Sequence, residues 1–276
     1  MKKWLPVLLI AAIVAVTAFT PRKITWVAIG DSITYLNEHP DETGNRITKG
    51  YLTRVTEKLP DIQYINKGYN GWTSGGIADA IEKLDLVKAD VYSVFLGTND
   101  WWGGRPVGTF SDYLHKTGNS TVYGAFRTII DKLKSLNKNA HIILITPLQR
   151  GDFVYIADMH NNAWGSYKEN KGQQLSQVVA AIDSIAGYEH FDKLDLYHNS
   201  GITLENMVKY KRLKDPATGE YKDYHWPEYK DIPFHPDTDE YPYPVSAIDM
   251  TYDGLHPSDK GFAVIADMLV EIIKRY

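Results

Sequence analysis

The sequence predicts an α/β protein in which a parallel β-sheet lies between two layers of helices. Short apolar runs rich in β-branched residues alternate with segments whose apolar residues recur at helical spacing. Strands that alternate with helices generally pair in parallel, through right-handed crossovers. Polar, glycine-containing motifs follow several of the apolar runs, and open α/β sheets bind ligands at that end of their strands. The same pattern therefore predicts both the fold class and the edge of the sheet that carries the site.

Each predicted strand is a short apolar run that ends at or near a glycine, asparagine or proline. The last run is less regular than the others. The predicted strands are 24–29, 62–65, 91–96, 141–146 and 191–197.

Amphipathic stripes predict the helices between the strands. The clearest stripe places five apolar side chains on one face: Val122, Phe126, Ile129, Ile130 and Leu133. The predicted helices are 50–59, 76–87, 121–136, 173–185 and 260–275.

Three segments lack regular periodicity and are expected to be irregular. The range 35–49 is polar and the range 101–110 is rich in glycine, so both are expected as loops beside the site. The range 201–251 is rich in Tyr, Pro, Asp and Lys, and ordered loops of this length are often functional. We expect an irregular insertion there, with a short hairpin around 217–219.

The composition fits one large domain. A chain of 276 residues with 43% hydrophobic residues can bury a single large core. We therefore expect one domain over 21–276, with the irregular insertion at 201–251. A net charge of -4 argues against nucleic acid as the main partner.

The range 1–20 has the pattern of an export signal. Lys2 and Lys3 precede an uncharged run over 4–19, and the residues at 16–18 offer a plausible cleavage point. The run is short for a membrane-spanning helix of ~20 residues, but an uncleaved anchor is the alternative. We expect an exported protein that is periplasmic, extracellular or on the cell surface.

The first predicted strand ends in Gly30-Asp31-Ser32, which places a serine on a tight turn after a core strand. Such a serine displays its hydroxyl group and leaves its backbone N–H free. Alone the motif is weak evidence for a nucleophile, because all three residue types are common in loops. The chain has no Gly-x-Ser-x-Gly motif, which argues against an ordinary α/β-hydrolase nucleophile elbow.

Three further motifs strengthen the interpretation. Residues 66–73 (Asn-Lys-Gly-Tyr-Asn-Gly-Trp-Thr) follow the second strand, residues 97–100 (Gly-Thr-Asn-Asp) follow the third, and residues 253–257 (Asp-Gly-Leu-His-Pro) lie near the carboxyl terminus. In this order the four motifs resemble the SGNH (GDSL) hydrolase family, over roughly residues 24–276 apart from a divergent segment before the last motif. The resemblance implies a flavodoxin-like α/β/α sandwich and a serine ester hydrolase.

Ester hydrolysis at a serine requires a nucleophile, a base and a group that orients the base. Ser32 can supply the nucleophile, and His256 is the candidate base because imidazole titrates near neutral pH. Among nine histidines His256 is distinguished by Asp253, three positions earlier in a short turn. A carboxylate at this spacing can reach the far ring nitrogen and fix its tautomer. The alternative is that Asp253 or Ser258 only caps the last helix.

The negative oxygen of the tetrahedral intermediate requires hydrogen-bond donors already in place. The resemblance implies three: the backbone N–H groups of Ser32 and Gly71, and the side-chain amide of Asn99. As isolated residues, Gly71 and Asn99 would be ordinary turn residues. Asp31 and Asp100 are expected to hold loops by accepting backbone hydrogen bonds, outside the catalytic set.

Aromatic residues near the motifs are candidates for binding sugar rings, whose apolar faces pack on aromatic side chains. Trp72, Trp101 and Trp102 each follow a catalytic motif. Trp226 is explained equally well by core packing. The range 235–239 contains His and Asp, but a polar turn explains it better than a metal site does. No cofactor or metal is expected.

The fold does not select among esters. Export, negative charge and a rim rich in Trp and Tyr favour a polar, ring-shaped substrate, whereas a lipase should carry a more continuous apolar patch near Ser32. We therefore expect removal of acyl groups, most simply O-acetyl groups, from a carbohydrate through an acyl-enzyme on Ser32.

Alternatives are a lysophospholipase, thioesterase or short-chain carboxylesterase of the same family, and a non-catalytic glycan-binding protein on this scaffold. The expected partner is a small-molecule or glycan ester, with membrane contact only through an uncleaved N-terminal segment.

Overall fold

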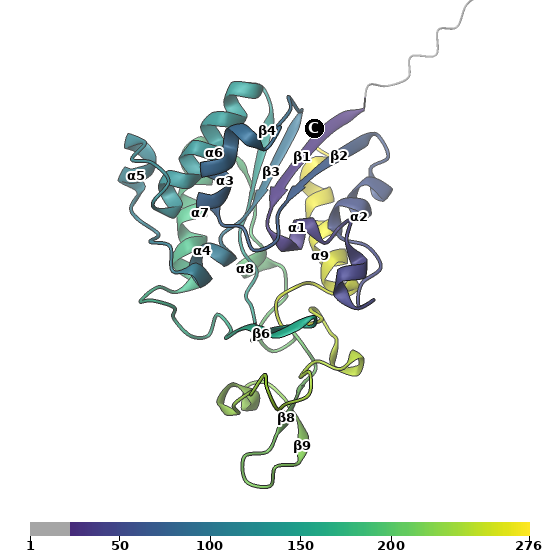
Figure 1. Cartoon of the computed structure of the whole chain (residues 1–276). Helices are drawn as coiled ribbons and strands as arrows, with labels where there is room; N and C mark the ends of the chain where they lie inside the picture. Colours follow the sequence, from purple (N-terminus) through teal and green to yellow (C-terminus); the bar gives the residue numbers. More distant parts are fainter. Residues whose placement is uncertain (1–22) are drawn as a thin grey trace, which may run out of the picture.

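A central parallel sheet organises the computed structural model, which describes residues 23–276. Its five strands lie in the order β2-β1-β3-β4-β7 (Figure 1). This order is flavodoxin-like and confirms the predicted fold class. Every predicted strand is present, although β2 is longer and β7 is shorter than the sequence indicated. The strands are β1 (Ile24–Gly30), β2 (Ile62–Gly68), β3 (Val91–Phe95), β4 (His141–Ile145) and β7 (Asp192–Leu194).

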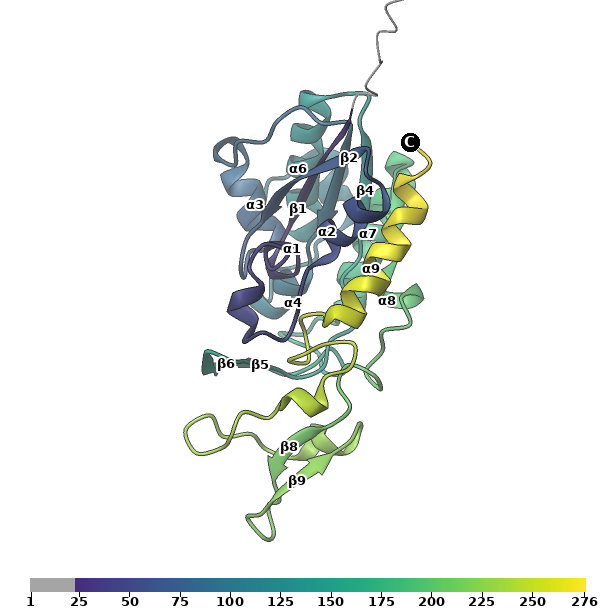
Figure 2. The ribbon, with the colours of Figure 1, turned by 90° about the vertical axis from the view of Figure 1, so that its right-hand side faces the viewer.

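Helices cover both faces of the sheet, as Figures 1 and 2 show. One face packs against α3 (Ser74–Ala80), α4 (Thr98–Gly103), α5 (Phe110–His115), α6 (Val122–Leu136) and α7 (Leu175–Glu189). The other packs against α1 (Ser32–Tyr35), α2 (Tyr51–Lys58), α8 (Leu196–Asn199) and α9 (Asp259–Ile273).

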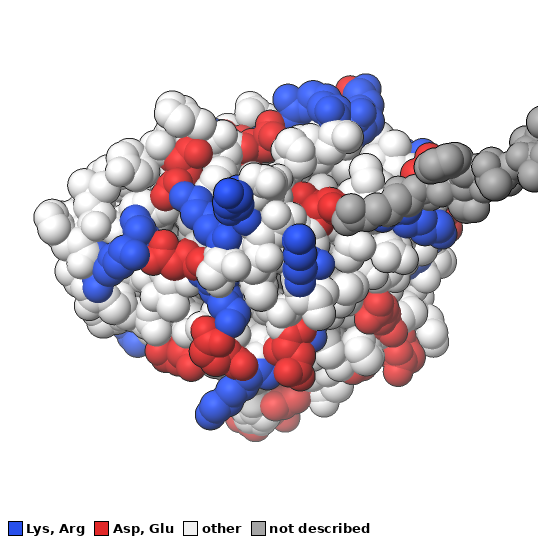
Figure 3. Space-filling view, turned by 90° about the horizontal axis from the view of Figure 1, so that it is seen from above, with Lys and Arg blue, Asp and Glu red and all other residues white. Residues whose placement is uncertain are grey.

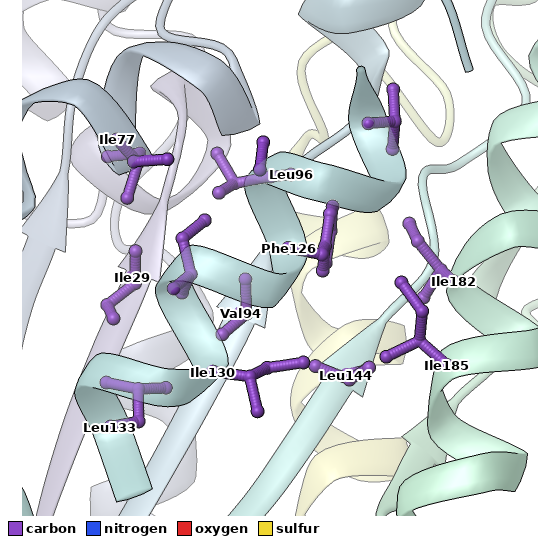
Figure 4. Close-up of a cluster of buried hydrophobic side chains, with 14 of the residues drawn as sticks. Ile29, Ile77, Val94, Leu96, Phe126, Ile130, Leu133, Leu144, Ile182 and Ile185 are labelled. Atoms are coloured by element: carbon purple, nitrogen blue, oxygen red, sulfur yellow. The ribbon is translucent and has the colours of Figure 1, made fainter. Parts of the chain in front are cut away.

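The two cores follow from strand geometry, because successive side chains of a strand point to opposite faces. In β1, Val27 and Ile29 belong to the core under α6 and α7, whereas Trp26 and Ala28 belong to the core under α2 and α9. Figure 4 shows part of the first core, where side chains of the sheet meet those of α6 and α7. The result is a rigid sheet whose carboxyl edge is held from both sides.

Three predicted segments differ from the structure. The helix predicted over 76–87 ends as an α-helix at Ala80 and continues only as a short 3-10 turn, Ile81–Lys83. Asp85 then adopts a left-handed backbone, which a helix cannot contain. The loop predicted over 101–110 is wrong at its start, because α4 extends through Trp101 and Trp102 and ends before Gly104, which is left-handed. The loop predicted over 35–49 contains one 3-10 turn, Pro40–Thr43.

Two antiparallel hairpins lie beyond the carboxyl edge of the sheet (Figures 1 and 2). The first, β5 (Phe153–Tyr155) and β6 (Asp158–Ala163), was not predicted. The second, β8 (Lys211–Lys214) and β9 (Tyr221–Tyr224), confirms the hairpin predicted around 217–219. Apart from these strands, the range 201–251 forms only short 3-10 turns, Glu228–Asp231 and Val245–Ala247.

The export signal predicted over 1–20 lies outside the described residues. Within 23–276, no helix combines the length and the apolar character that a membrane crossing requires. At the end of the sheet opposite the site, Lys and Arg side chains are interspersed with Asp and Glu (Figure 3).

Candidate active site

Ser32, Asp253 and His256 come from opposite ends of the chain and meet at the carboxyl edge of the sheet. Ser32 is the first residue of α1, directly after β1. His256 Nε2 lies 2.8 Å from Ser32 Oγ, and His256 Nδ1 lies 2.7 Å from Asp253 Oδ2. Both distances are in hydrogen-bond range. The structure therefore places an imidazole between an alcohol and a carboxylate, which is the order that a serine nucleophile requires.

The turn that carries His256 is held by Asp253 itself. Oδ1 of Asp253 accepts the backbone N–H groups of Leu255 and His256 at 3.0 and 2.7 Å, which leaves Oδ2 for the imidazole. Gly254 has a φ of +88°, and a Cβ there would lie 1.8 Å from the carbonyl oxygen of Asp152. Only glycine fits this position. Ser258, rather than Asp253, is the residue that caps α9.

Asp31 is buried next to this group of residues. Its Oδ1 accepts the backbone N–H of Ile33 at 3.0 Å, so it holds the turn as expected. Burial raises the pKa of Asp31 to about 7, although the hydrogen bond from Ile33 and the charge of His256 act in the opposite direction. The charge of this carboxyl group therefore changes near neutral pH.

Gly71 and Asn99 line the same pocket as Ser32. Gly71 has a left-handed backbone, with a φ of +72°. Asn99 Nδ2 donates a hydrogen bond to the carbonyl oxygen of Trp72 at 3.0 Å. Because an amide nitrogen carries two hydrogens, the second is left for a ligand.

Asp100 clamps together the loops that follow β2 and β3. Its two carboxylate oxygens accept the backbone N–H of Ser74 at 2.8 Å and the Ser74 hydroxyl at 2.7 Å. Burial raises the pKa of Asp100, against the hydrogen bonds from Ser74 and the charge of Arg105. The predicted role of Asp100 in holding a loop is confirmed, and its effect is to fix Gly71 relative to Asn99.

The β5–β6 hairpin forms a roof over a pocket of about 410 Å³ that contains these residues. Phe153 packs edge-on against the imidazole of His256, with ring centroids 5.3 Å apart. Tyr252 stacks on the same imidazole at 5.8 Å. Phe153, Leu255 and Trp102 form an apolar wall. Polar side chains elsewhere in the lining include Glu42, Asn70, Thr73, Arg150 and Asn161.

The three tryptophans predicted to bind sugar lie in different places in the structure. Trp102 lines the pocket. The prediction for Trp101 is wrong, because α4 turns this side chain into the core, where its indole N–H donates to the Gln173 carbonyl oxygen at 2.9 Å. Trp72 stacks on Tyr69 and is not among the residues that line the pocket; it contributes its carbonyl oxygen to Asn99. Trp226 packs in a separate apolar cluster within the insertion.

Arg150 is a pocket residue that sequence reasoning missed. It is only 1% exposed, and its guanidinium lies 5.5 Å from the ring centroids of both Trp101 and Trp102. Burial lowers the pKa of Arg150 to about 10, while the charges of Asp253, Asp152 and Asp31 act against that shift. The available signal was its position just after a predicted strand, at the edge that carries the other motifs.

The range 235–239 forms a turn. Asp239 accepts the backbone N–H of His235 at 2.7 Å and pairs with Lys214. Across residues 23–276, no group of three or more His, Cys, Asp or Glu side chains is arranged to hold a metal ion.

The site contains a serine, an imidazole and a carboxylate linked in this order by hydrogen bonds. It lies at the point of a flavodoxin-like sheet where the strand order reverses. This arrangement is that of an α/β serine hydrolase. Residues 28–264 match the model of the GDSL-like lipase/acylhydrolase family. The chain therefore belongs to this family, and it is a carboxylic ester hydrolase. No curated protein matches it.

Solved structures include a similar chain, described as a possible lipase from Chitinophaga pinensis DSM 2588. The two share 60% identity with a TM-score of 0.91, over 92% of this chain and 98% of the other. A protein from Lactobacillus plantarum is 21% identical with a TM-score of 0.63, over 92% and 98% of the two chains. The acetyl xylan esterase AlAXEase is 20% identical with a TM-score of 0.54, over 91% and 100%. At these two lower identities the similarity concerns the fold alone.

Proposed function

We propose that this enzyme removes short acyl groups, acetyl above all, from hydroxyl groups of a carbohydrate. One observation carries the choice of substrate: the pocket above Ser32 combines an aromatic wall with polar side chains. Trp102 and Phe153 can pack on the apolar face of a sugar ring, while Asn70 and Asn161 can bond its hydroxyl groups. The pocket has a volume of about 410 Å³, which lies within the range of small-molecule sites.

In this proposal His256 Nε2 takes the proton of Ser32 Oγ as that oxygen attacks the ester carbonyl carbon. Asp253 stabilises the imidazolium that results. The negative oxygen of the tetrahedral intermediate is bound by the backbone N–H groups of Ser32 and Gly71 and by the free amide hydrogen of Asn99. His256 then protonates the departing sugar oxygen, and water attacks the acyl-enzyme in the same way.

Hydrolysis of a lipid ester is the second candidate, because the 60% identical relative is described as a possible lipase. A lipase acting on aggregated lipid needs a continuous apolar surface around its site. The large apolar side chains exposed within 23–276 do not line the catalytic pocket: Val87, Leu114, Trp164, Tyr188 and Val245. Trp164 alone among these five lines a cavity adjoining the site, so the surface favours the carbohydrate ester.

The test is a comparison of substrates with one purified enzyme. Acetate release is measured from acetylated polysaccharides, and a chromogenic ester series from acetate to palmitate gives the acyl preference. We expect acetate release from a glycan and activity that falls as the acyl chain lengthens. Efficient cleavage of long-chain lipids without any action on acetylated glycans would overturn the proposal. Glycan binding without turnover of any ester would instead favour a non-catalytic role.

A further inference from the structure

A second cavity, of about 440 Å³, lies on the other face of the β5–β6 hairpin. The alternation of side chains along a strand divides the hairpin between the two spaces. Tyr155 and Asn161 line the catalytic pocket alone, and Val154 and Asn162 line the second cavity alone. Phe153 and Ala163, a facing pair, line both. The hairpin is therefore a thin wall shared by the catalytic pocket and the second cavity.

An aromatic pair joins the two spaces at the end of this wall. Trp102 lines the catalytic pocket, and Trp164, just after β6, lines the second cavity. Their rings meet edge to face with centroids 4.7 Å apart. Trp164 is 40% exposed, which is high for a residue whose large apolar ring is usually well buried. The exposed ring of Trp164 therefore lies beside Trp102, at the border of the catalytic pocket.

An ion pair and hydrogen bonds hold residues that line the second cavity. Lys211 is 2% exposed, and its Nζ lies 2.8 Å from Asp152 Oδ2. The other oxygen of Asp152 accepts the Gly165 backbone N–H at 2.9 Å and the Tyr167 hydroxyl at 2.7 Å. These bonds fix the segment that presents Trp164 and Tyr167, so that a ligand would bind a surface already in place.

The rim of the second cavity adds hydrogen-bond donors. Lys168 and Lys230 are exposed and line it, together with the rings of Tyr167 and Phe234. Ammonium groups can donate to hydroxyl or carboxylate oxygens, and aromatic rings can stack on sugars. Aromatic rings beside flexible donors are suited to a carbohydrate rather than to an acyl chain.

We propose that the second cavity binds further sugar units of the glycan chain whose acyl group lies at Ser32, so that the substrate is a polysaccharide rather than a single sugar. This inference rests on the proposed function. Two observations carry it: the two cavities share lining residues of the hairpin, and Trp102 of the catalytic pocket contacts the exposed ring of Trp164 in the second cavity.

The test compares KM for an acetylated polysaccharide with KM for an acetylated monosaccharide. Trp164→Ala should raise KM for the polymer about tenfold, and by clearly more than for the monosaccharide, because it removes a stacking surface used only by the chain. Trp164→Tyr should restore most of the affinity. Tyr188→Ala removes another exposed aromatic ring, on α7, and should change neither value.

Lys230→Ala is the second variant, on a rim residue that is exposed and lines only the second cavity. It should raise KM for the polymer about threefold. If Trp164→Ala and Lys230→Ala affect polymer and monosaccharide equally, the second site is refuted while the proposed function stands. If the wild-type enzyme releases no acetate from any glycan, both are refuted.

Discussion

The carboxyl edge of the central sheet and the segments that cover it contribute to the site in different ways. At the edge, Ser32, Gly71 and Asn99 follow three adjacent strands whose register pairs Gly30 with both Gly68 and Phe95. The cover is made of short hairpins and irregular chain. The edge holds Ser32 and the proposed oxyanion donors together with Trp102 and Asn70, and the cover adds Phe153 and Asn161 to the same pocket. In the proposed function the edge therefore carries the reaction, and both regions bind the substrate.

The strongest test of the edge is Ser32→Ala. Ester hydrolysis should fall at least about ten-thousandfold, because no other hydroxyl replaces Oγ beside His256. Initial rates on a chromogenic acetate ester measure the loss, and thermal unfolding checks that the fold persists. Ser111→Ala, on an exposed serine, is the control and should keep full activity. Undiminished hydrolysis by Ser32→Ala would refute the mechanism.

Asp31→Asn tests whether the buried carboxyl group of Asp31 lowers the stability of the folded protein when it is ionised. Because the pKa of Asp31 is raised from 3.8 to about 7, the folded state binds this proton more tightly than the unfolded state does. The contribution of Asp31 to stability therefore falls between about pH 4 and pH 7, by up to about 4 kcal/mol. Asparagine keeps the acceptor for Ile33 but cannot ionise.

The gain in Tm of Asp31→Asn over the wild type should be small near pH 4 and should reach a plateau above pH 7. Thermal unfolding across this range measures it. Asp61→Asn, at an exposed aspartate, should show no such trend. A gain that is constant with pH would argue against titration of Asp31.

Asn99→Ala removes one donor to the developing negative oxygen. We expect kcat to fall about a hundredfold, or about 3 kcal/mol, with little change in KM, because this bond strengthens in the transition state. Steady-state kinetics on a small acetate ester separates the two constants. Asn139→Ala, at an exposed asparagine, serves as the comparison. A change confined to KM would make Asn99 a substrate-binding residue only.

Phe153→Ala tests the cover and should have the smallest effect. Its ring packs against His256 and forms part of the apolar wall. We expect KM for the glycan ester to rise about fivefold, near 1 kcal/mol, with a smaller change in kcat. If kcat instead falls as far as in Asn99→Ala, the cover takes part in the reaction and the division between the two regions fails.

The sequence predicted the edge well because local rules govern it. A buried strand, a turn and a helix determine where Ser32 and Asn99 lie, whatever distant segments do. Trp101 and Trp102 show the limit. They are adjacent, yet one is buried and the other lines the pocket, because the rotation of α4 decides which side chain faces the core. Because glycines follow these two tryptophans, the sequence indicated a loop, and α4 was not predicted.

The cover was less predictable because it depends on long-range contacts. The β5–β6 hairpin is stabilised by packing on Leu255, about a hundred residues away in the chain. Arg150 is buried beside Trp101 and Trp102, about fifty residues earlier in the chain. Neither arrangement leaves a periodic signal in the sequence.

The close approach of Gly254 to the Asp152 carbonyl limits where substitutions can change the substrate specificity of the enzyme. The turn that positions His256 and the chain leading into the roof also share a backbone bond, from the Gly151 N–H to the Gly254 carbonyl oxygen at 2.8 Å. New specificities can therefore arise by remodelling the hairpin tip or the distal insertion. Alterations at 150–152 would disturb the imidazole itself, so this junction should tolerate the least variation among descendants that remain active.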